Sequence, residues 1–128
     1  DTLLVKELRR LGAHVTVAVK NGPPSLNDAL MEDALMVGMD KAADELITTG
    51  ADAIGIRLDE SPKWFIDRYN NADLIVAKGM ANWETMTETP APCPTMYVFR
   101  TKCEPVAMAV GAPENQSIAF LVEKGWKL

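Results

Sequence analysis

The sequence predicts an α/β fold, a three-layer α/β/α sandwich of Rossmann-like type with a mostly parallel sheet of about five strands. Short β-branched runs alternate along the chain with helical stretches, and parallel strands need crossover helices of this kind. The chain has 128 residues, of which 48% are hydrophobic and 24% charged, the composition of an ordinary globular domain. We therefore expect residues 1–128 to form a single α/β domain.

The first half of the chain carries helix and strand signals in alternation. Apolar residues at helical spacing predict an opening helix, and Gly12 suits the cap that ends it. A β-branched run predicts a strand over 14–19, which the Gly-Pro-Pro segment at 22–24 ends. Further along, we expect helices over 27–39 and 41–49 and a strand over 51–56.

The second half repeats this alternation. Ser61 and Pro62 predict a helix start, with serine as N-cap and proline at the first helical position. Apolar runs predict strands over 73–77, 95–99 and 117–122, and a helix is expected over 104–110. The strands and helices together favour crossover connections and a parallel sheet.

Charge and composition exclude several classes of partner. The net charge of −5 argues against a nucleic-acid surface. No apolar run approaches the roughly 20 residues of a membrane span, and no signal peptide is recognisable. The two cysteines, Cys93 and Cys103, are too few for a disulfide framework. We expect a cytoplasmic protein that contacts neither nucleic acid nor membrane.

A lysine and a glycine end the apolar strand at 73–77. In open parallel sheets, ligands bind beyond the carboxyl ends of the strands, where Lys78 is expected. Gly79 allows a sharp turn, and a short helix beginning near Asn82 would favour an anion. A mobile lysine suits a phosphate. The alternative is a lysine that only reaches solvent from a strand edge, with Asn82 as an ordinary helix cap.

Asn27 and Asp28 follow the first predicted strand. Both residue types are preferred helix caps, so capping is one interpretation of this pair. The other interpretation is that Asp28 faces the same edge of the sheet as Lys78. A carboxylate beside a lysine is what a divalent cation and a phosphate need together.

Three stretches of the chain together resemble the damage-control phosphatase family. They are "PSLNDA" at 24–29 with "EDA" at 32–34, "DLIVAKGMANWE" at 73–84, and "KC" at 102–103. The likeness covers nearly the whole chain, and these motifs occur in the family's order and spacing. The Lys-Gly-x-x-Asn-aromatic-Glu stretch is the most specific of them, and it resembles the archaeal and bacterial branch of the family.

The resemblance implies a metal-dependent phosphatase that hydrolyses small phosphometabolites, such as sugar phosphates or damaged cofactor intermediates. It implies a divalent cation (Mn, Ni, Co or Mg) held by Asp28, and a substrate phosphate held by Lys78. These two residues are the catalytic candidates. The residues implied in substrate binding are Asn27, Lys78, Gly79, Asn82 and Glu84.

The sequence departs from the family pattern at its beginning. The family's first motif, Asp-Asn-x-Gly-Glu, supplies two further metal ligands and should precede the opening helix, where this sequence lacks it. We therefore expect the chain to be a C-terminal fragment with little activity of its own, and its uncovered surface to favour a homo-oligomer. Two alternatives remain: a non-catalytic Rossmann-like module that binds a nucleotide or sugar phosphate, and a purely structural fragment.

Overall fold

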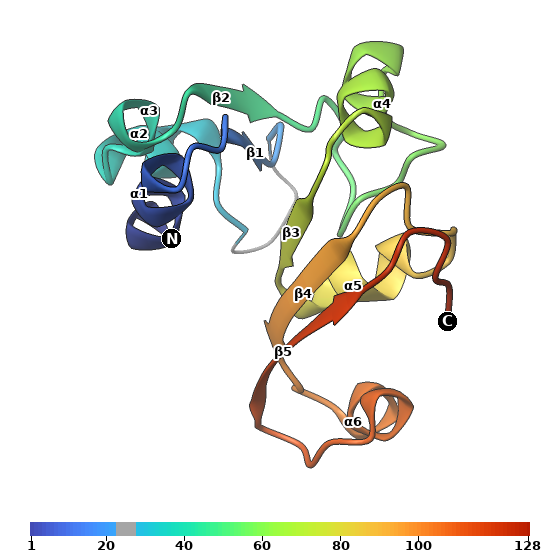
Figure 1. Ribbon diagram of the computed structural model, residues 1–128. Helices are drawn as coiled ribbons and strands as arrows, with labels where there is room; N and C mark the ends of the chain where they lie inside the picture. Colours follow the sequence, from blue (N-terminus) through green and yellow to red (C-terminus); the bar gives the residue numbers. More distant parts are fainter. Residues whose placement is uncertain (23–27) are drawn as a thin grey trace. The chain divides into compact units, whose positions relative to one another are not determined.

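The computed structural model describes residues 1–22 and 28–128, and the chain forms two compact units, Asp1–Ala53 and Ile54–Leu128 (Figure 1). Helices and strands alternate in both units, so the predicted α/β class is confirmed. No helix in the described part of the chain has the length and apolar character needed to cross a membrane. The elements are α1 (Thr2–Arg10), β1 (Thr16–Val19), α2 (Met31–Met36), α3 (Met39–Ala42), β2 (Glu45–Thr48), α4 (Lys63–Asn70), β3 (Ile75–Lys78), α5 (Met80–Met86), β4 (Thr95–Arg100), α6 (Glu104–Val110) and β5 (Ser117–Val122).

The first unit packs α1, α2 and α3 against a parallel pair of strands. β1 and β2 pair with Val17 opposite Leu46, and these side chains meet a core of small and apolar helix residues. Asp44 connects α1 to the segment before β1. Its carboxylate accepts a hydrogen bond from the N–H of Val15 at 2.9 Å and forms an ion pair with Arg9 at 2.8 Å. The buried core residues of this unit are Val5, Ala34, Met39, Ala42 and Ala43.

Three predictions for residues up to 56 are wrong in the described part of the chain. The segment expected as a helix over 41–49 instead forms β2, because Ile47 and Thr48 are β-branched and pair with β1. The strand expected over 51–56 is irregular, and Gly55 within it takes a positive φ of 69°, outside the extended region of a strand. The long helix expected over 27–39 begins at a residue outside the described part of the chain, and within the described part only Met31–Met36 forms a helix, α2, before Gly38 interrupts it with a φ of 71°.

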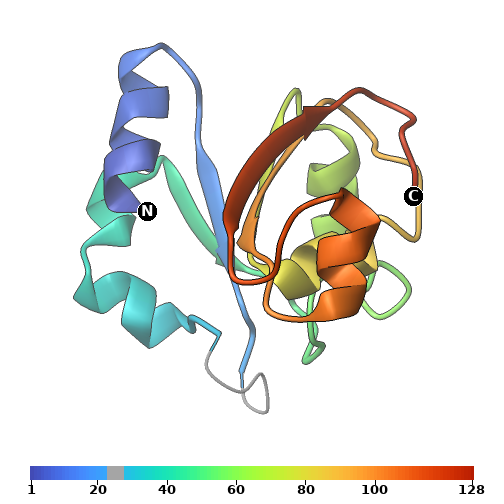
Figure 2. The same cartoon turned by 90° about the horizontal axis from the view of Figure 1, so that it is seen from below.

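The second unit is built on a mixed sheet with the strand order β3–β4–β5. β3 and β4 run parallel, whereas β5 is antiparallel to β4, and Ala77, Tyr97 and Phe120 are aligned across the sheet. These residues share one face with buried Phe99, and Trp83 of α5 packs there with its ring 5.5 Å from that of Phe99. Figure 2 shows α4, α5 and α6 on the same side of this sheet. The core of the unit lies between this layer of helices and the sheet.

The antiparallel direction of β5 has a local cause. Thr101, which follows β4 and is fully buried, donates its hydroxyl to the carbonyl of Pro113 at 2.7 Å and accepts the N–H of Gln116 at 3.0 Å. These bonds bring the chain back beside the end of β4, so β5 runs in the opposite direction. The described strands therefore form two sheets, one parallel and one mixed, and a single mostly parallel sheet of about five strands is not confirmed.

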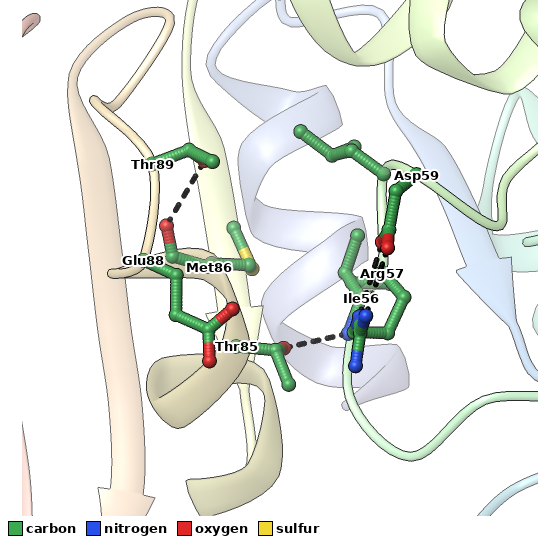
Figure 3. Close-up of a pocket in the computed structure, with 8 residues that line it drawn as sticks. Ile56, Arg57, Asp59, Thr85, Met86, Glu88 and Thr89 are labelled. Atoms are coloured by element: carbon green, nitrogen blue, oxygen red, sulfur yellow. Dashed lines mark hydrogen bonds and ion pairs between the residues drawn. The ribbon is translucent and has the colours of Figure 1, made fainter.

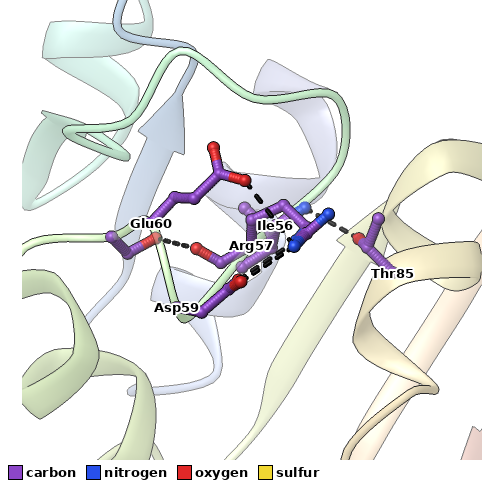
Figure 4. Close-up of polar contacts among 6 residues, drawn as sticks. Ile56, Arg57, Asp59, Glu60 and Thr85 are labelled. Atoms are coloured by element: carbon purple, nitrogen blue, oxygen red, sulfur yellow. Dashed lines mark hydrogen bonds and ion pairs between the residues drawn. The ribbon is translucent and has the colours of Figure 1, made fainter.

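A loop ahead of α4 is fastened to α5 (Figure 4). The hydroxyl of Thr85 accepts the N–H of Ile56 at 2.8 Å and donates to the carbonyl of Ala81 at 3.0 Å. Gly55 is buried against this contact, and a Cβ at that position would collide with the Thr85 side chain and the Ala81 carbonyl. The loop thus supports the helix that follows Lys78.

We predict that Gly55→Ala lowers the free energy of unfolding by about 2–4 kcal/mol, because a positive φ and a steric clash act together. Gly111→Ala is the matched control, since Gly111 has a similar φ of 66° but open space where the alanine methyl group would lie. It should cost about 1–2 kcal/mol for the backbone alone. Urea unfolding of the two variants measures the difference, and equal losses would contradict the clash.

Candidate functional site

Polar side chains gather where β1 and β2 end in the first unit. The strands are parallel, so their carboxyl ends lie at one edge of the sheet. The hydroxyl of Thr48 donates to Asn21 Oδ1 at 3.1 Å, and Asn21 Nδ2 donates to Asp52 Oδ1 at 3.3 Å. Lys20 Nζ donates to the carbonyl of Ala53 at 3.0 Å. This edge is therefore held by a network that joins the segments following the two strands.

Lys20 is a residue that the sequence analysis missed. It is only 7% exposed and follows β1 directly, and its backbone N–H donates to the carbonyl of Ala29 at 3.1 Å. Burial lowers the pKa of its ammonium group, while the negative charge of Asp28 acts in the opposite direction. The signal that singled out Lys78, a lysine at the end of an apolar strand, is also present at Lys20.

Asp28 is exposed and lies outside any helix, because α2 begins at Met31. The carboxylate that supports the start of α2 is that of Asp33, which accepts the N–H of Leu30 at 2.9 Å. Asp28 is therefore available for a role other than capping. Asn27, its predicted partner in the site, lies outside the described residues.

Lys78 is the last residue of β3 and is exposed. Gly79 follows with a φ of 101°, and its N–H donates to the carbonyl of Val98 at 2.9 Å, which anchors the turn to β4. Because α5 begins at Met80, Gly79 and not Asn82 occupies the N-cap position. The lysine thus stands on a turn that is fixed to the sheet.

The side chain of Asn82 is directed at this turn. Its Nδ2 donates to the carbonyl of Lys78 at 2.7 Å, so the amide braces the backbone that carries the lysine. Its Oδ1 is buried and finds no hydrogen-bond partner in the described part of the chain. Glu84, the last member of the predicted loop, is exposed on α5.

The predicted site residues thus fall into two groups. Asp28 belongs to the first unit, while Lys78, Gly79, Asn82 and Glu84 belong to the second. The convergence of Asp28 and Lys78 on one ligand stays a prediction.

The side chains of the described residues do not by themselves fit a divalent metal ion. Within 1–22 and 28–128, no three His, Cys, Asp or Glu side chains gather as a metal site requires. Hard cations take several oxygen ligands at once, so the carboxylate of Asp28 alone would hold such an ion weakly.

A pocket of about 200 Å³ opens in the second unit between the loop at 56–59 and the end of α5 (Figure 3). Arg57 in this loop binds Asp59 through two hydrogen bonds of 3.1 and 2.8 Å, which together with nearby acidic charge raise the pKa of the guanidinium. Glu88 adds a second carboxylate to the lining. Because the carboxylates outnumber the single guanidinium, this pocket is a poor site for a phosphate group.

Comparison with known proteins points to one family. Residues 1–118 match the family described as "Damage-control phosphatase ARMT1-like domain". A damage-control phosphatase of Archaeoglobus fulgidus is 44% identical over 123 residues, and damage-control phosphatase PH1575 of Pyrococcus horikoshii is 33% identical over 121 residues. The crystal structure of the Pyrococcus horikoshii protein, described as a DUF89 family protein, superposes with a TM-score of 0.82 at 30% identity.

The similarity covers most of this chain but less than half of each relative. The alignments include 96% and 94% of the chain, but only 42% and 41% of the Archaeoglobus and Pyrococcus proteins. The superposition covers 98% of the chain and 42% of the solved structure. The chain therefore corresponds to one part of these longer proteins.

The two aspartates near α2 should respond differently to substitution. Asp33→Ala should lower the free energy of unfolding by about 1 kcal/mol, because the N–H of Leu30 loses its acceptor. Asp28→Ala should cost less than Asp33→Ala, because Asp28 is exposed, lies outside the helix and loses only its charge interaction with Lys20. Thermal unfolding of both variants tests this expectation. An equal loss of unfolding free energy in the two variants would mean that Asp28 also supports the start of α2.

Proposed function

This chain belongs to the damage-control phosphatase family with an ARMT1-like domain, and on that premise we propose that the protein is a phosphomonoesterase acting on small phosphorylated metabolites. Sugar phosphates and damaged cofactor intermediates are the proposed substrate classes. The observation that carries the proposal is Lys78, an exposed lysine on an anchored turn at the carboxyl end of a strand.

Lys78 is proposed to neutralise charge on the phosphoryl group. During phosphate ester hydrolysis, negative charge spreads over the phosphoryl oxygens, and a fixed cation lowers the barrier by stabilising it. The hydrogen bonds from Gly79 N–H to Val98 and from Asn82 Nδ2 to Lys78 hold the backbone before the substrate arrives. Such preorganisation is what makes one charged side chain effective.

The other loop residues are assigned supporting roles. Gly79 has open space where a side chain would be, so a phosphate could approach the backbone closely there. Asn82 supports the turn, and Glu84 and Asn27 contact the non-phosphate part of the substrate or its attacking water. Asp28 provides one carboxylate ligand for a divalent cation (Mn, Ni, Co or Mg), which when bound polarises a phosphoryl oxygen.

The physiological setting follows from the same premises. The acidic net charge of −5 argues against nucleic acid or an anionic membrane surface as partner, and we propose a small phosphorylated metabolite as the ligand. We propose a cytoplasmic enzyme, since Cys93 and Cys103 are free thiols, as is usual in a reducing compartment. Self-association of this part of the protein, giving a homo-oligomer, is also proposed.

Lys78→Ala in the longer protein should raise KM or lower kcat by roughly ten- to a thousandfold, the scale of losing one charge-stabilising group. Lys78→Arg, which keeps the charge, should retain more activity. Lys63→Ala is the control, because Lys63 is exposed on α4 and pairs with Asp67. Turnover of p-nitrophenyl phosphate measures these effects, and unchanged kinetics in a folded Lys78→Ala protein would remove this lysine from the site.

The 128-residue chain alone should bind divalent metal weakly and show little phosphatase activity, because its described residues offer no cluster of ligands. Purified chain assayed with excess manganese, nickel or cobalt tests this expectation. Turnover comparable with that of a full-length relative would mean that the metal site has been misplaced.

A further inference from the structure

The sheet of the second unit has a face that the helices of this unit do not cover. Figure 2 shows α4, α5 and α6 on one side of the sheet, so no helix of residues 54–128 lies on the other side, the back face. Side chains alternate between the two faces of a strand, so the neighbours of buried Ala77, Tyr97 and Phe99 along their strands point to the back face. These neighbours and their partners on β5 form two rows across the strands: Val76, Met96 and Leu121, and Lys78, Val98 and Ala119.

The back face is apolar except at one end. Lys78 and, beyond it, Arg100 form a polar margin, and the other residues of the two rows are apolar. These apolar residues are half-buried or exposed, and Leu121 is 51% exposed. A sheet face that meets water carries polar residues at alternate positions, whereas strands buried on both faces are apolar without interruption. β4 is apolar over 96–99 and β5 over 118–122, so the sequence of this sheet is that of a sheet covered on both faces.

The relatives of this chain are long enough to supply such a cover. The chain spans 42% of the Archaeoglobus protein and 42% of the solved Pyrococcus structure, so more than half of each relative lies outside the matched part. Neighbouring strands lie about 4.8 Å apart, so three strands make a face about 10 Å wide, close to the diameter of one α-helix. A segment of the same polypeptide also has a high effective concentration at this face, which a separate molecule lacks.

We propose that the back face is the docking surface for a helix from the part of the longer protein outside residues 1–128. The side of this helix that meets the sheet is apolar, because Val76, Met96 and Leu121 offer no charged group to compensate a buried polar one. Since Lys78 lies in the second row, the docked helix would border the turn that carries this lysine. The inference goes beyond the proposed function and does not depend on it, because it concerns how this chain joins the rest of the protein.

The first test compares thiol labelling in the isolated chain, at high dilution, with labelling in the longer protein. Leu121→Cys should react with a maleimide more slowly in the longer protein, by about tenfold or more, because the docked helix excludes the reagent. Met108→Cys is the matched control: Met108 is 74% exposed on α6, on the other side of the sheet, and its variant should react at the same rate in both. Mass spectrometry of the labelled peptides separates these thiols from Cys93 and Cys103.

Circular dichroism of each variant establishes that it is folded. Ala119→Cys makes a smaller change on the same face and takes the place of Leu121→Cys if that variant does not fold. Equal labelling rates of the back-face thiol in the isolated chain and in the longer protein would overturn the proposal.

The second test identifies the occupant of the back face. A diazirine-bearing amino acid replaces Leu121 in the longer protein, and mass spectrometry identifies the peptide crosslinked to it by light. We expect a peptide of the same molecule from outside the part that corresponds to residues 1–128. A crosslink to residues 1–53, or one between two copies of the protein, would overturn the proposal. The phosphatase function is judged separately, by turnover of the longer protein and its Lys78→Ala variant, because neither labelling nor crosslinking requires activity.

Discussion

An apolar strand inside a protein can place charged groups only at its ends, and the positions of both lysines that stand out in this chain follow from that constraint. β1 and β3 are both apolar over most of their length, and a lysine stands at the carboxyl end of each. The two lysines nevertheless differ in environment. Lys78 is exposed on a turn, whereas Lys20 is enclosed by the segments at 29–30 and 53. The same sequence feature thus yields one accessible charge and one hidden charge.

The sequence predicts those elements whose signal is local. The strands at 14–19, 73–77, 95–99 and 117–122 are present, and α6 occupies the expected 104–110. The sequence around β2 predicts a helix, because the alanines just before it and its own apolar residues have helical spacing. Only its pairing with β1 gives β2 the conformation of a strand. The direction of β5 could not be predicted either, since it depends on hydrogen bonds of the Thr101 side chain to residues 12 and 15 positions away.

The candidate site could be predicted in part for the same reason. Lys78 and Gly79 stand out because the end of their strand is visible in the sequence, and the structure describes both at a strand-to-helix turn. The partner of Asn82 could not be predicted, because its bond to the Lys78 carbonyl depends on α5 beginning at Met80. The burial of Lys20 could not be predicted from the sequence, because it depends on the tertiary packing of distant segments. The roles of Asp28 and Asn27 stay predictions.

The hydrogen bonds of Thr101 to the 113–116 turn have a consequence for how the second unit folds. The Thr101 hydroxyl closes a segment of chain only 15 residues long, which contains α6 and joins β4 to β5. Partners across the sheet are also close in sequence, since Arg100 and Ser117 of β4 and β5 are 17 positions apart and Ile75 and Thr95 of β3 and β4 are 20 positions apart. Short loops lose little conformational entropy on closure, so we expect this sheet to assemble from contacts that are local in the sequence and to fold rapidly.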